Sequence, residues 1–273
     1  MAKIKVRLDA LLVERGLFET RSRAAAAVLA GEVRVGAAVV AKPGQLLGED
    51  AEVAVEERPR FVSRGGIKLA NALESSGVAV TGRRALDVGA STGGFTDCLL
   101  EAGAAHVVAL DVAYGQLSWS LREDPRVTVI ERTNARALSP GLLPYAPELI
   151  VADVSFISLR TVLPAVLACA APRFDVLALV KPQFEVGRAG VGKGGVVRDA
   201  SARVAALVAV GERALELGAS VLGFWFSGLP GPKGNRETFI QLAEGERGQG
   251  LAAGDLEGAA TEADGRARET GGV

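Results

Sequence analysis

The sequence has few residues of the types that bind metals. Its 273 residues include two cysteines, Cys98 and Cys169, and a single histidine, His106. Both cysteines lie in apolar runs and no Cys-x-x-Cys pair is present, so packing in a core explains them. A zinc site needs three or four nitrogen, sulfur or oxygen ligands. We therefore expect no metal site, and the low cysteine content suits a reducing cytosol.

Long hydrophobic runs are also missing. A membrane-spanning helix needs about 18 or more consecutive apolar residues, whereas the longest runs, such as 162–171, are interrupted and shorter. The first residues carry charges with no apolar segment behind them, unlike a secretory signal peptide. The sequence therefore predicts a cytoplasmic protein without membrane contact.

Neither sign of charge is in large excess. The 31 basic and 32 acidic residues give a net charge of −1. From Glu244 onward there are seven acids and three bases, a net charge of −4, so the rest of the chain sums to +3. Such a modestly basic body neither proves nor excludes a polyanionic partner.

Residues 1–57 are predicted to form a small domain of their own. Apolar residues at helical spacing indicate two helices, at about 8–16 and 20–31, each ended by a glycine. Alternating valines then indicate short strands within 33–40 and at 52–55. Two helices followed by a small sheet constitute an α+β domain.

Two segments lack the patterns of helices and strands. Residues 58–66 contain a proline and a Gly-Gly pair, which predict a linker. Residues 244–273 consist largely of Gly, Ala, Glu and Thr with almost no large apolar side chains, which predicts a disordered tail.

Residues 67–243 alternate between strand and helix patterns. The predicted strands are 84–88, 107–111, 127–130, 148–153, 175–180 and 220–226, and the predicted helices are 67–76, 93–102, 115–122, 158–170 and 201–217. Such alternation is typical of a parallel sheet with helices on both faces, an α/β fold. A last strand at 237–242 follows so short a loop that antiparallel pairing is expected.

The segment from Ala85 to Asp111 is typical of a nucleotide-like ligand site. A buried strand ends in Asp87-Val-Gly-Ala-Ser-Thr-Gly-Gly, whose glycines allow close approach of the backbone and precede the free N–H groups of a helix. Asp111 lies 24 residues after Asp87, at the end of the next predicted strand. An acid at that position can accept hydrogen bonds from both ribose hydroxyls. The spacing differs from the Gly-x-Gly-x-x-Gly of dinucleotide folds. This spacing, together with an acid at Asp87 that can face a positively charged methionine group, favours S-adenosylmethionine over NAD.

The predicted cofactor-binding residues are Asp87, Gly89, Ala90, Ser91, Thr92, Gly93, Gly94, Phe95, Asp111, Val112 and Asn134. For the glycines, the alternative is a tight strand–helix turn without a ligand. For Asn134, the alternative is a turn asparagine that contacts no cofactor.

Two groups of motifs resemble known families. The motifs that resemble an S4 domain, which binds structured RNA, are Arg7-Leu-Asp, Thr20-Arg-Ser-Arg, Gly31-x-Val-x-Val-Gly and Lys42-Pro-Gly. Those that together resemble the TlyA family of ribosomal RNA 2′-O-methyltransferases, historically also called hemolysins, are Val62-Ser-Arg-Gly-Gly-Ile-Lys-Leu, the Asp87 segment, Asp153-Val-Ser-Phe-Ile-Ser and Leu179-Val-Lys-Pro-Gln-Phe-Glu. The resemblance covers roughly residues 3–243. It implies a class I (Rossmann-like), FtsJ-like methyltransferase domain behind an S4 domain, with S-adenosylmethionine as cofactor and ribosomal RNA as partner.

The resemblance also implies a Lys-Asp-Lys-Glu catalytic tetrad, here Lys68, Asp153, Lys181 and Glu237. These residues are separated by 85, 28 and 56 positions, so only the fold can bring them together. Lys181 is the candidate general base, provided that burial and the charge of Lys68 favour its neutral form. Asp153 acts in the opposite direction, and the alternative role for Lys181 is to orient the hydroxyl without removing its proton. A purely structural ion pair between Asp153 and Lys181 is the further alternative.

The predicted RNA-binding residues are Arg7, Arg21, Arg23, Arg34, Lys42 and Arg64. The first 60 residues hold ten bases and nine acids, so binding requires these charges to gather on one face. A solvated helix face is the alternative. Arg58, Arg60 and Arg64 are further hypothesised to couple the RNA-binding domain to the active site. Phe156 is either a platform for a displaced base or a core residue.

We therefore expect 2′-O-methylation of a ribose, in a cytidine of 16S and/or 23S ribosomal RNA. Two alternatives come from other classes of protein. One is a catalytically silent RNA-binding factor of ribosome assembly, which the intact tetrad argues against. The other is a membrane-active hemolysin, which neither a membrane span nor a long amphipathic segment supports.

Overall fold

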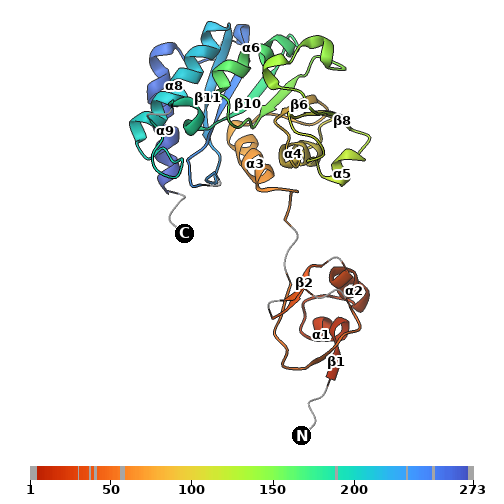
Figure 1. The fold of residues 1–273 in the computed structure, drawn as a ribbon. Helices are drawn as coiled ribbons and strands as arrows, with labels where there is room; N and C mark the ends of the chain where they lie inside the picture. The colour runs from red at the N-terminus through yellow and green to blue at the C-terminus, as the bar shows by residue number, and fades with distance from the viewer. Residues whose placement is uncertain are drawn as a thin grey trace. The chain divides into compact units, whose positions relative to one another are not determined.

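The computed structural model of the protein describes residues 5–29, 31–36, 38–39, 42–55, 59–187, 190–231, 233–247 and 250–269. The chain divides into two compact units, Met1–Pro59 and Arg60–Val273 (Figure 1).

The smaller unit contains the two predicted helices and two small sheets. Its elements are β1 (Lys5–Arg7), α1 (Leu8–Glu14), α2 (Arg21–Leu29), β2 (Val33–Val35), β3 (Ala38–Val39), β4 (Leu46–Gly48) and β5 (Val53–Val55). β1 pairs antiparallel with β4, and β2 pairs antiparallel with both β3 and β5. Leu8 and Leu12, one helical turn apart, are fully buried against Val28 and Val33. The sequence did not predict β1 and β4, because three residues are too few to show a period. Val40, which was included in a predicted strand, lies outside the described residues.

The larger unit is built on a seven-stranded sheet in the order β11-β12-β10-β9-β6-β7-β8. The strands are β6 (Arg84–Val88), β7 (His106–Leu110), β8 (Val127–Ile130), β9 (Leu149–Ala152), β10 (Asp175–Val180), β11 (Ala219–Phe226) and β12 (Thr238–Glu244). The strand pairings of this sheet are parallel except those of β12, which runs antiparallel to β10 and β11. The predicted α/β fold with a terminal antiparallel hairpin is confirmed.

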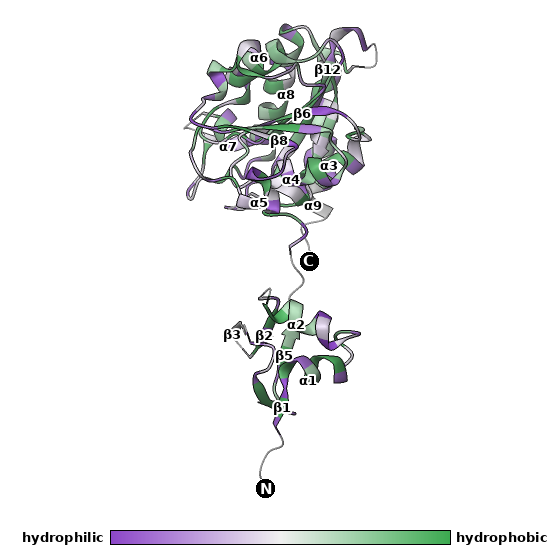
Figure 2. Cartoon of the chain, turned by 90° about the vertical axis from the view of Figure 1, so that its right-hand side faces the viewer, coloured by the Kyte–Doolittle hydropathy of each residue, from purple (hydrophilic) through white to green (hydrophobic). Residues whose placement is uncertain are grey.

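Helices cover both faces of this sheet (Figure 1). One hydrophobic cluster packs α3 (Arg64–Ser76), α4 (Gly94–Glu101) and α5 (Trp119–Arg122) on one face. A second cluster packs α6 (Leu159–Cys169), α8 (Ala200–Glu216) and α9 (Leu256–Glu269) on the other. The one-turn helix α7 (Pro182–Glu185) follows β10. The strands are largely hydrophobic (Figure 2), as expected of a sheet buried on both faces.

The prediction that the segment 244–273 is disordered was wrong. Most of its described part is folded, because α9 places Leu256, Ala260 and Ala263 in the core. These residues recur at helical spacing, but two are alanines, and a composition argument based on large apolar side chains overlooks them. Residues 248–249 and 270–273 lie outside the described residues.

The predicted linker was also wrong over residues 60–66, which belong to the larger unit. The Phe61 ring is buried and fills the space beside Gly66, where a Cβ atom would collide with it. The backbone N–H of Val62 donates to Asp97 at 2.8 Å, and Arg60 bonds Glu101 at 2.6 Å. Gly66 therefore serves close packing inside a helix, not chain flexibility. Arg58 lies outside the described residues.

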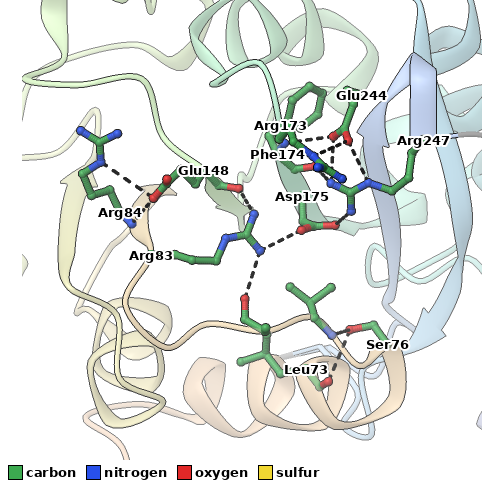
Figure 3. Close-up of polar contacts among 12 residues, drawn as sticks. Leu73, Ser76, Arg83, Arg84, Glu148, Arg173, Phe174, Asp175, Glu244 and Arg247 are labelled. Atoms are coloured by element: carbon green, nitrogen blue, oxygen red, sulfur yellow. Dashed lines mark hydrogen bonds and ion pairs between the residues drawn. The ribbon is translucent and has the colours of Figure 1, made fainter.

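A charged network joins the amino ends of the parallel strands (Figure 3). Asp175, at the start of β10, accepts from Arg83 at 2.7 Å and pairs with Arg247. Arg247 also bonds Glu244 at 2.8 Å, and Arg83 donates to the Glu148 carbonyl. At this edge the polar groups pair with one another. The carboxyl edge of the sheet is arranged differently.

Candidate functional site

Two adjoining cavities lie at the carboxyl ends of the parallel strands, where open α/β sheets bind ligands. One has a volume of about 450 Å³ and the other about 660 Å³. They share Gly89, Ser91, Asp153 and Ser155 as lining residues. We call the smaller one the tetrad cavity and the larger one the Asp111 cavity, after the residues that each contains.

The turn between β6 and α4 forms the shared wall. The N–H groups of Gly89 and Ala90 donate to the Leu110 carbonyl at 2.8 and 3.0 Å, which fixes the turn against β7. Gly89 has φ +86°, and a Cβ atom there would lie 2.6 Å from the Asp153 carbonyl oxygen. Ser91 adopts φ +51°, an uncommon conformation for a residue with a side chain. Such local strain is often found at ligand sites.

Gly93 and Gly94 serve a different purpose from the one that the sequence suggested. A Cβ atom on Gly93 would collide with Leu121, and one on Gly94 would collide with the Ser63 side chain. The space that these glycines leave open is therefore filled by the protein itself. Gly94 still lines the tetrad cavity, together with Ala90, Thr92 and Phe95.

The carboxylate of Asp87 lies beneath this turn rather than in either cavity. Its side chain is fully buried, and Thr96 Oγ1 donates to its Oδ2 at 2.7 Å. Within the described part of the chain, Oδ1 has no hydrogen-bond partner. Burial raises the pKa of Asp87 to about 7, and the negative charge of Asp153 adds to this shift. The sequence predicted that Asp87 contacts the cofactor directly, but its side chain lines neither of the two cavities.

Asp111 lies directly after β7 and lines the Asp111 cavity. Its two carboxylate oxygens accept hydrogen bonds at 2.7 Å from the N–H groups of Ser91 and Ala113. Val112 is largely exposed beside it, and Asn134 lines the same cavity. The Asn134 Oδ1 atom accepts from the Arg136 N–H at 3.0 Å, so the predicted turn role is present while its amide group remains at the cavity.

All four predicted tetrad residues line the tetrad cavity. They form two ion pairs. Lys181 Nζ, at the end of β10, lies 2.6 Å from Asp153 Oδ1 and donates to Ser155 Oγ at 2.8 Å. Lys68, on α3, pairs with Glu237, immediately before β12, and both side chains are almost fully buried. Each lysine charge therefore has a carboxylate partner.

Glu185 anchors the loop that follows Asp153. Its buried carboxylate accepts from Ser158 Oγ at 2.5 Å and from the Leu159 N–H at 2.7 Å. The loop presents Phe156, which has φ +62° and is 92% exposed, with its ring 5.3 Å from that of Phe184. Phe156 is thus not a core residue.

A third cavity of about 430 Å³ opens beside Lys181, and we call it the Phe156 cavity. Its lining residues include Ser155, Phe156, Lys181, Phe184, Gly195, Lys233, Asn235 and Glu237. Sequence reasoning did not single out Ser155, Phe184, Lys233 or Asn235. Ser155 and Phe184 lie inside the quoted motifs, but nothing in the pattern distinguishes them from neighbouring residues.

In the smaller unit, Asp9 forms ion pairs with two of the predicted RNA-binding arginines. Its buried carboxylate accepts from Arg7 at 2.8 Å and from Arg21 at 3.2 Å, while both guanidinium groups remain about half exposed. The hydrogen bond from Arg7 holds the pKa of Asp9 at about 2. The exposed Lys42 begins the loop whose Gly44 packs against the Arg7 guanidinium.

The other predicted RNA-binding residues are distributed differently. Arg23 forms an exposed pair with Glu19 at 2.6 Å, and Arg34 lies on β2. Arg64 belongs to the larger unit, where it lines the tetrad cavity and donates to the Pro230 carbonyl at 3.2 Å.

No group of three or more His, Cys, Asp or Glu side chains suited to a metal occurs among the described residues. Over the same residues, no helix combines the length and hydrophobicity that crossing a membrane requires.

Each of the two units of the chain matches a known protein family. The S4 domain matches residues 6–53, and the FtsJ-like methyltransferase family matches residues 61–244. The 16S/23S rRNA (cytidine-2′-O)-methyltransferase TlyA of Mycobacterium tuberculosis (strain ATCC 25618 / H37Rv) is 51% identical over 93% of this chain and 96% of its own. A Bacillus subtilis (strain 168) protein, provisionally named rRNA methyltransferase YqxC, is 45% identical over 92% of this chain and 91% of its own.

A solved structure agrees with these relationships. A protein from Streptococcus thermophilus, provisionally described as a hemolysin, is 38% identical and superimposes with a TM-score of 0.73 over 98% of both chains. The resemblance seen in the sequence motifs is thereby confirmed. This chain is a member of the TlyA family, an FtsJ-like methyltransferase that carries an S4 domain at its amino end.

Proposed function

We propose that this chain transfers the methyl group of S-adenosylmethionine to the 2′-hydroxyl of a cytidine ribose in ribosomal RNA. The observation that carries the proposal is the convergence of Lys68, Asp153, Lys181 and Glu237 on one cavity beside the glycine-rich turn. The 51% identical relative is named for this reaction on 16S and 23S rRNA, which favours the same substrate class here.

The cofactor would span the two adjoining cavities. Its adenosine suits the Asp111 cavity, where Asp111 can accept hydrogen bonds from the ribose hydroxyls and Asn134 offers an amide to the base. Its methionine end would then pass the shared wall at Gly89 and Ser91 toward the tetrad cavity. A bound sulfonium would favour the ionised form of the buried Asp87 beneath this wall, and the two opposite charges would then attract each other without contact.

The two ion pairs suggest how the acceptor is held. The sulfonium methyl group is already activated, so the protein mainly has to align the 2′-oxygen with the S–CH₃ bond and remove its proton. Alignment can supply up to about 7–11 kcal/mol, and general-base help about 10²–10⁴-fold in rate. Since Lys181 Nζ is held between Asp153 and Ser155, and Lys68 is paired with Glu237, we favour orientation of the hydroxyl by Lys181. The proton released as the O–CH₃ bond forms and the S–CH₃ bond breaks would then pass to water.

The acceptor base would enter the Phe156 cavity, which adjoins Lys181. An exposed aromatic ring such as Phe156 can stack on a base displaced from its helix. The S4 unit would add phosphate contacts through Arg7, Arg21 and Lys42, which lie around Asp9.

Labelled-methyl transfer to separated 16S- and 23S-containing subunits tests the proposal, followed by mapping of the modified nucleotide. We expect the parent protein to methylate a ribose, and Lys181→Ala to lose at least about 10²-fold in rate, because the 2′-oxygen is then misaligned. The dissociation constant for S-adenosylhomocysteine, measured by calorimetry, should change by less than about threefold, because Lys181 does not line the Asp111 cavity, which would hold the adenosine. The control is Arg173→Ala, an exposed residue at the opposite edge of the sheet.

Several outcomes would contradict the proposal. Parental rates in Lys181→Ala would remove Lys181 from the catalytic site. Methylation of a base would exclude the ribose as acceptor. RNA binding without any transfer by the parent protein would instead support the role of a silent assembly factor.

A further inference from the structure

The helix that the sequence did not predict, α9, is connected to the wall of the Phe156 cavity through a chain of polar contacts. We propose that the buried Arg203–Asp264 pair is a positioning device that holds the segment 190–199 in the shape that receives the acceptor nucleotide. This inference rests on the proposed function for its effect on RNA, but the device itself is defined by geometry.

The first contact joins α8 to α9. Arg203 Nε and Nη2 lie 2.6 and 2.7 Å from the two carboxylate oxygens of Asp264, and both residues are at least 94% buried. Bidentate pairing of this kind fixes the plane of the guanidinium group. The third nitrogen of Arg203, Nη1, donates to the carbonyls of Arg198 at 2.7 Å and Val197 at 3.3 Å. The carboxylate on α9 therefore orients an arginine that holds the end of the segment.

The second contact joins this segment to the cavity. Asn235 is 2% exposed, and its side chain accepts from the Val197 N–H at 2.9 Å and donates to the Gly195 carbonyl at 2.8 Å. Gly195 and Asn235 both line the Phe156 cavity, and Asn235 lies two residues before Glu237 of the tetrad. Arg203 and Asn235 thus hold the segment from opposite sides of Val197.

Among the described residues, the other hydrogen bonds of this segment are local turns and the cap of α8. Its glycines include Gly194 and Gly195, both with φ +83°, and Val197 is the buried apolar side chain within 190–199. Glycine-rich backbone loses much entropy on ordering, so a few hydrogen bonds decide whether it is ordered. The Asp111 cavity, in contrast, is lined by none of these residues. Loss of the device should therefore affect the RNA substrate and leave the cofactor unaffected.

The test compares Asp264→Asn with Glu262→Gln, in which an exposed acid of the same helix loses its charge. Hydrogen exchange in the full chain should speed up by about tenfold or more at 190–199 in Asp264→Asn only. The KM for the ribosomal subunit substrate should rise by about tenfold, while the dissociation constant for S-adenosylhomocysteine stays within about twofold. Equal exchange at 190–199 in both variants would overturn the proposal.

Because removing one partner of a buried pair also lowers global stability, a second variant separates the two effects. Arg203→Met/Asp264→Leu replaces the pair by apolar side chains of similar length, which often preserves stability. It still lacks the hydrogen bonds to Val197 and Arg198, so exchange at 190–199 should remain fast in a protein of near-parental stability. Recovery of slow exchange would show that the pair is only structural and would overturn the proposal.

The exchange measurement requires no enzymatic activity, which separates this inference from the proposed function. Absence of methyl transfer by the parent protein would contradict the proposed function, while exchange at 190–199 would still decide whether Arg203 and Asp264 position the segment.

Discussion

Asp87 combines complete burial with an incompletely bonded carboxylate. Its Oδ2 atom accepts from Thr96, but its Oδ1 atom has no partner among the described residues. An unpaired charge in such a place is costly, which is why burial raises the pKa to about 7. Asparagine has the same shape without the charge and would cost less free energy to bury here, yet the chain retains an aspartate. This is the pattern expected of a residue kept for function.

The first prediction is that Asp87→Asn stabilises the protein increasingly as the pH rises. The native carboxyl group binds a proton up to about pH 7, whereas in the unfolded chain it releases it near its ordinary value of 3.8. The stability associated with the neutral form is therefore present below about pH 4 and is lost as the pH rises to 7. Asparagine never ionises, so its advantage should grow to about 2–4 kcal/mol at pH 8.

Urea unfolding of parent and variant at pH 5 and pH 8 measures this difference. A difference that does not change between the two pH values would show that Asp87 is ionised in the folded protein throughout this range. The same variant should bind S-adenosylmethionine more weakly if the Asp87 charge favours the sulfonium.

At the scale of elements, α9 depends on small residues for its packing. Leu256 is fully buried, and a Cβ atom on Gly211 of α8 would lie 3.2 Å from its methyl groups. Ala260 and Ala263 continue the contact face at helical spacing. The helix therefore closes one face of the sheet and is part of the folded domain.

We predict that Leu256→Ala lowers the free energy of unfolding by about 2–4 kcal/mol, because it removes a buried side chain and leaves a cavity. Glu257→Ala, an exposed neighbour on the same helix, is the control and should change stability by less than about 0.5 kcal/mol. Chemical denaturation of both variants checks the prediction. Equal stabilities of the two would mean that α9 does not pack on α8 in solution.

At the scale of the whole molecule, the two units carry different tasks. The S4 unit holds exposed arginines, and the described lining residues of the three cavities belong to the larger unit. Phosphate contacts contribute affinity that falls steeply with salt concentration. RNA affinity and cofactor affinity should therefore be separable by cutting the chain between the units.

The fragment 60–273 is predicted to fold and to bind S-adenosylhomocysteine as the full chain does, since its core and cavities are its own. Its methyl transfer to ribosomal subunits should fall by about 10²-fold or more, because contacts with several phosphates are lost. Thermal unfolding, calorimetry and the transfer assay test the three statements. Transfer at the parental rate would show that the S4 unit is dispensable for substrate binding.

Local pattern was enough to predict much of this protein. Strand and helix periods depend on which face of each element is buried, so the positions of β6 to β12 along the chain and the antiparallel pairing of β12 could be predicted, but not the order of the strands in the sheet. The strand-end position of Asp111 also follows from its place after an apolar run. The motifs around Asp153 and Lys181 pointed to the family before any contact was known.

Only the tertiary structure decided which groups meet. The pairing of Lys181 with Asp153, and of Lys68 with Glu237, joins residues far apart in the chain, and nothing in a local pattern distinguishes one partner from another. The same holds for Gly93 and Gly94, whose open space is filled by side chains from other segments. Whether residues 256–269 form the ordered helix α9 likewise depends on their packing against α8. Burial and pairing are properties of the assembled fold, and they set the charges and shapes on which the chemistry of this site depends.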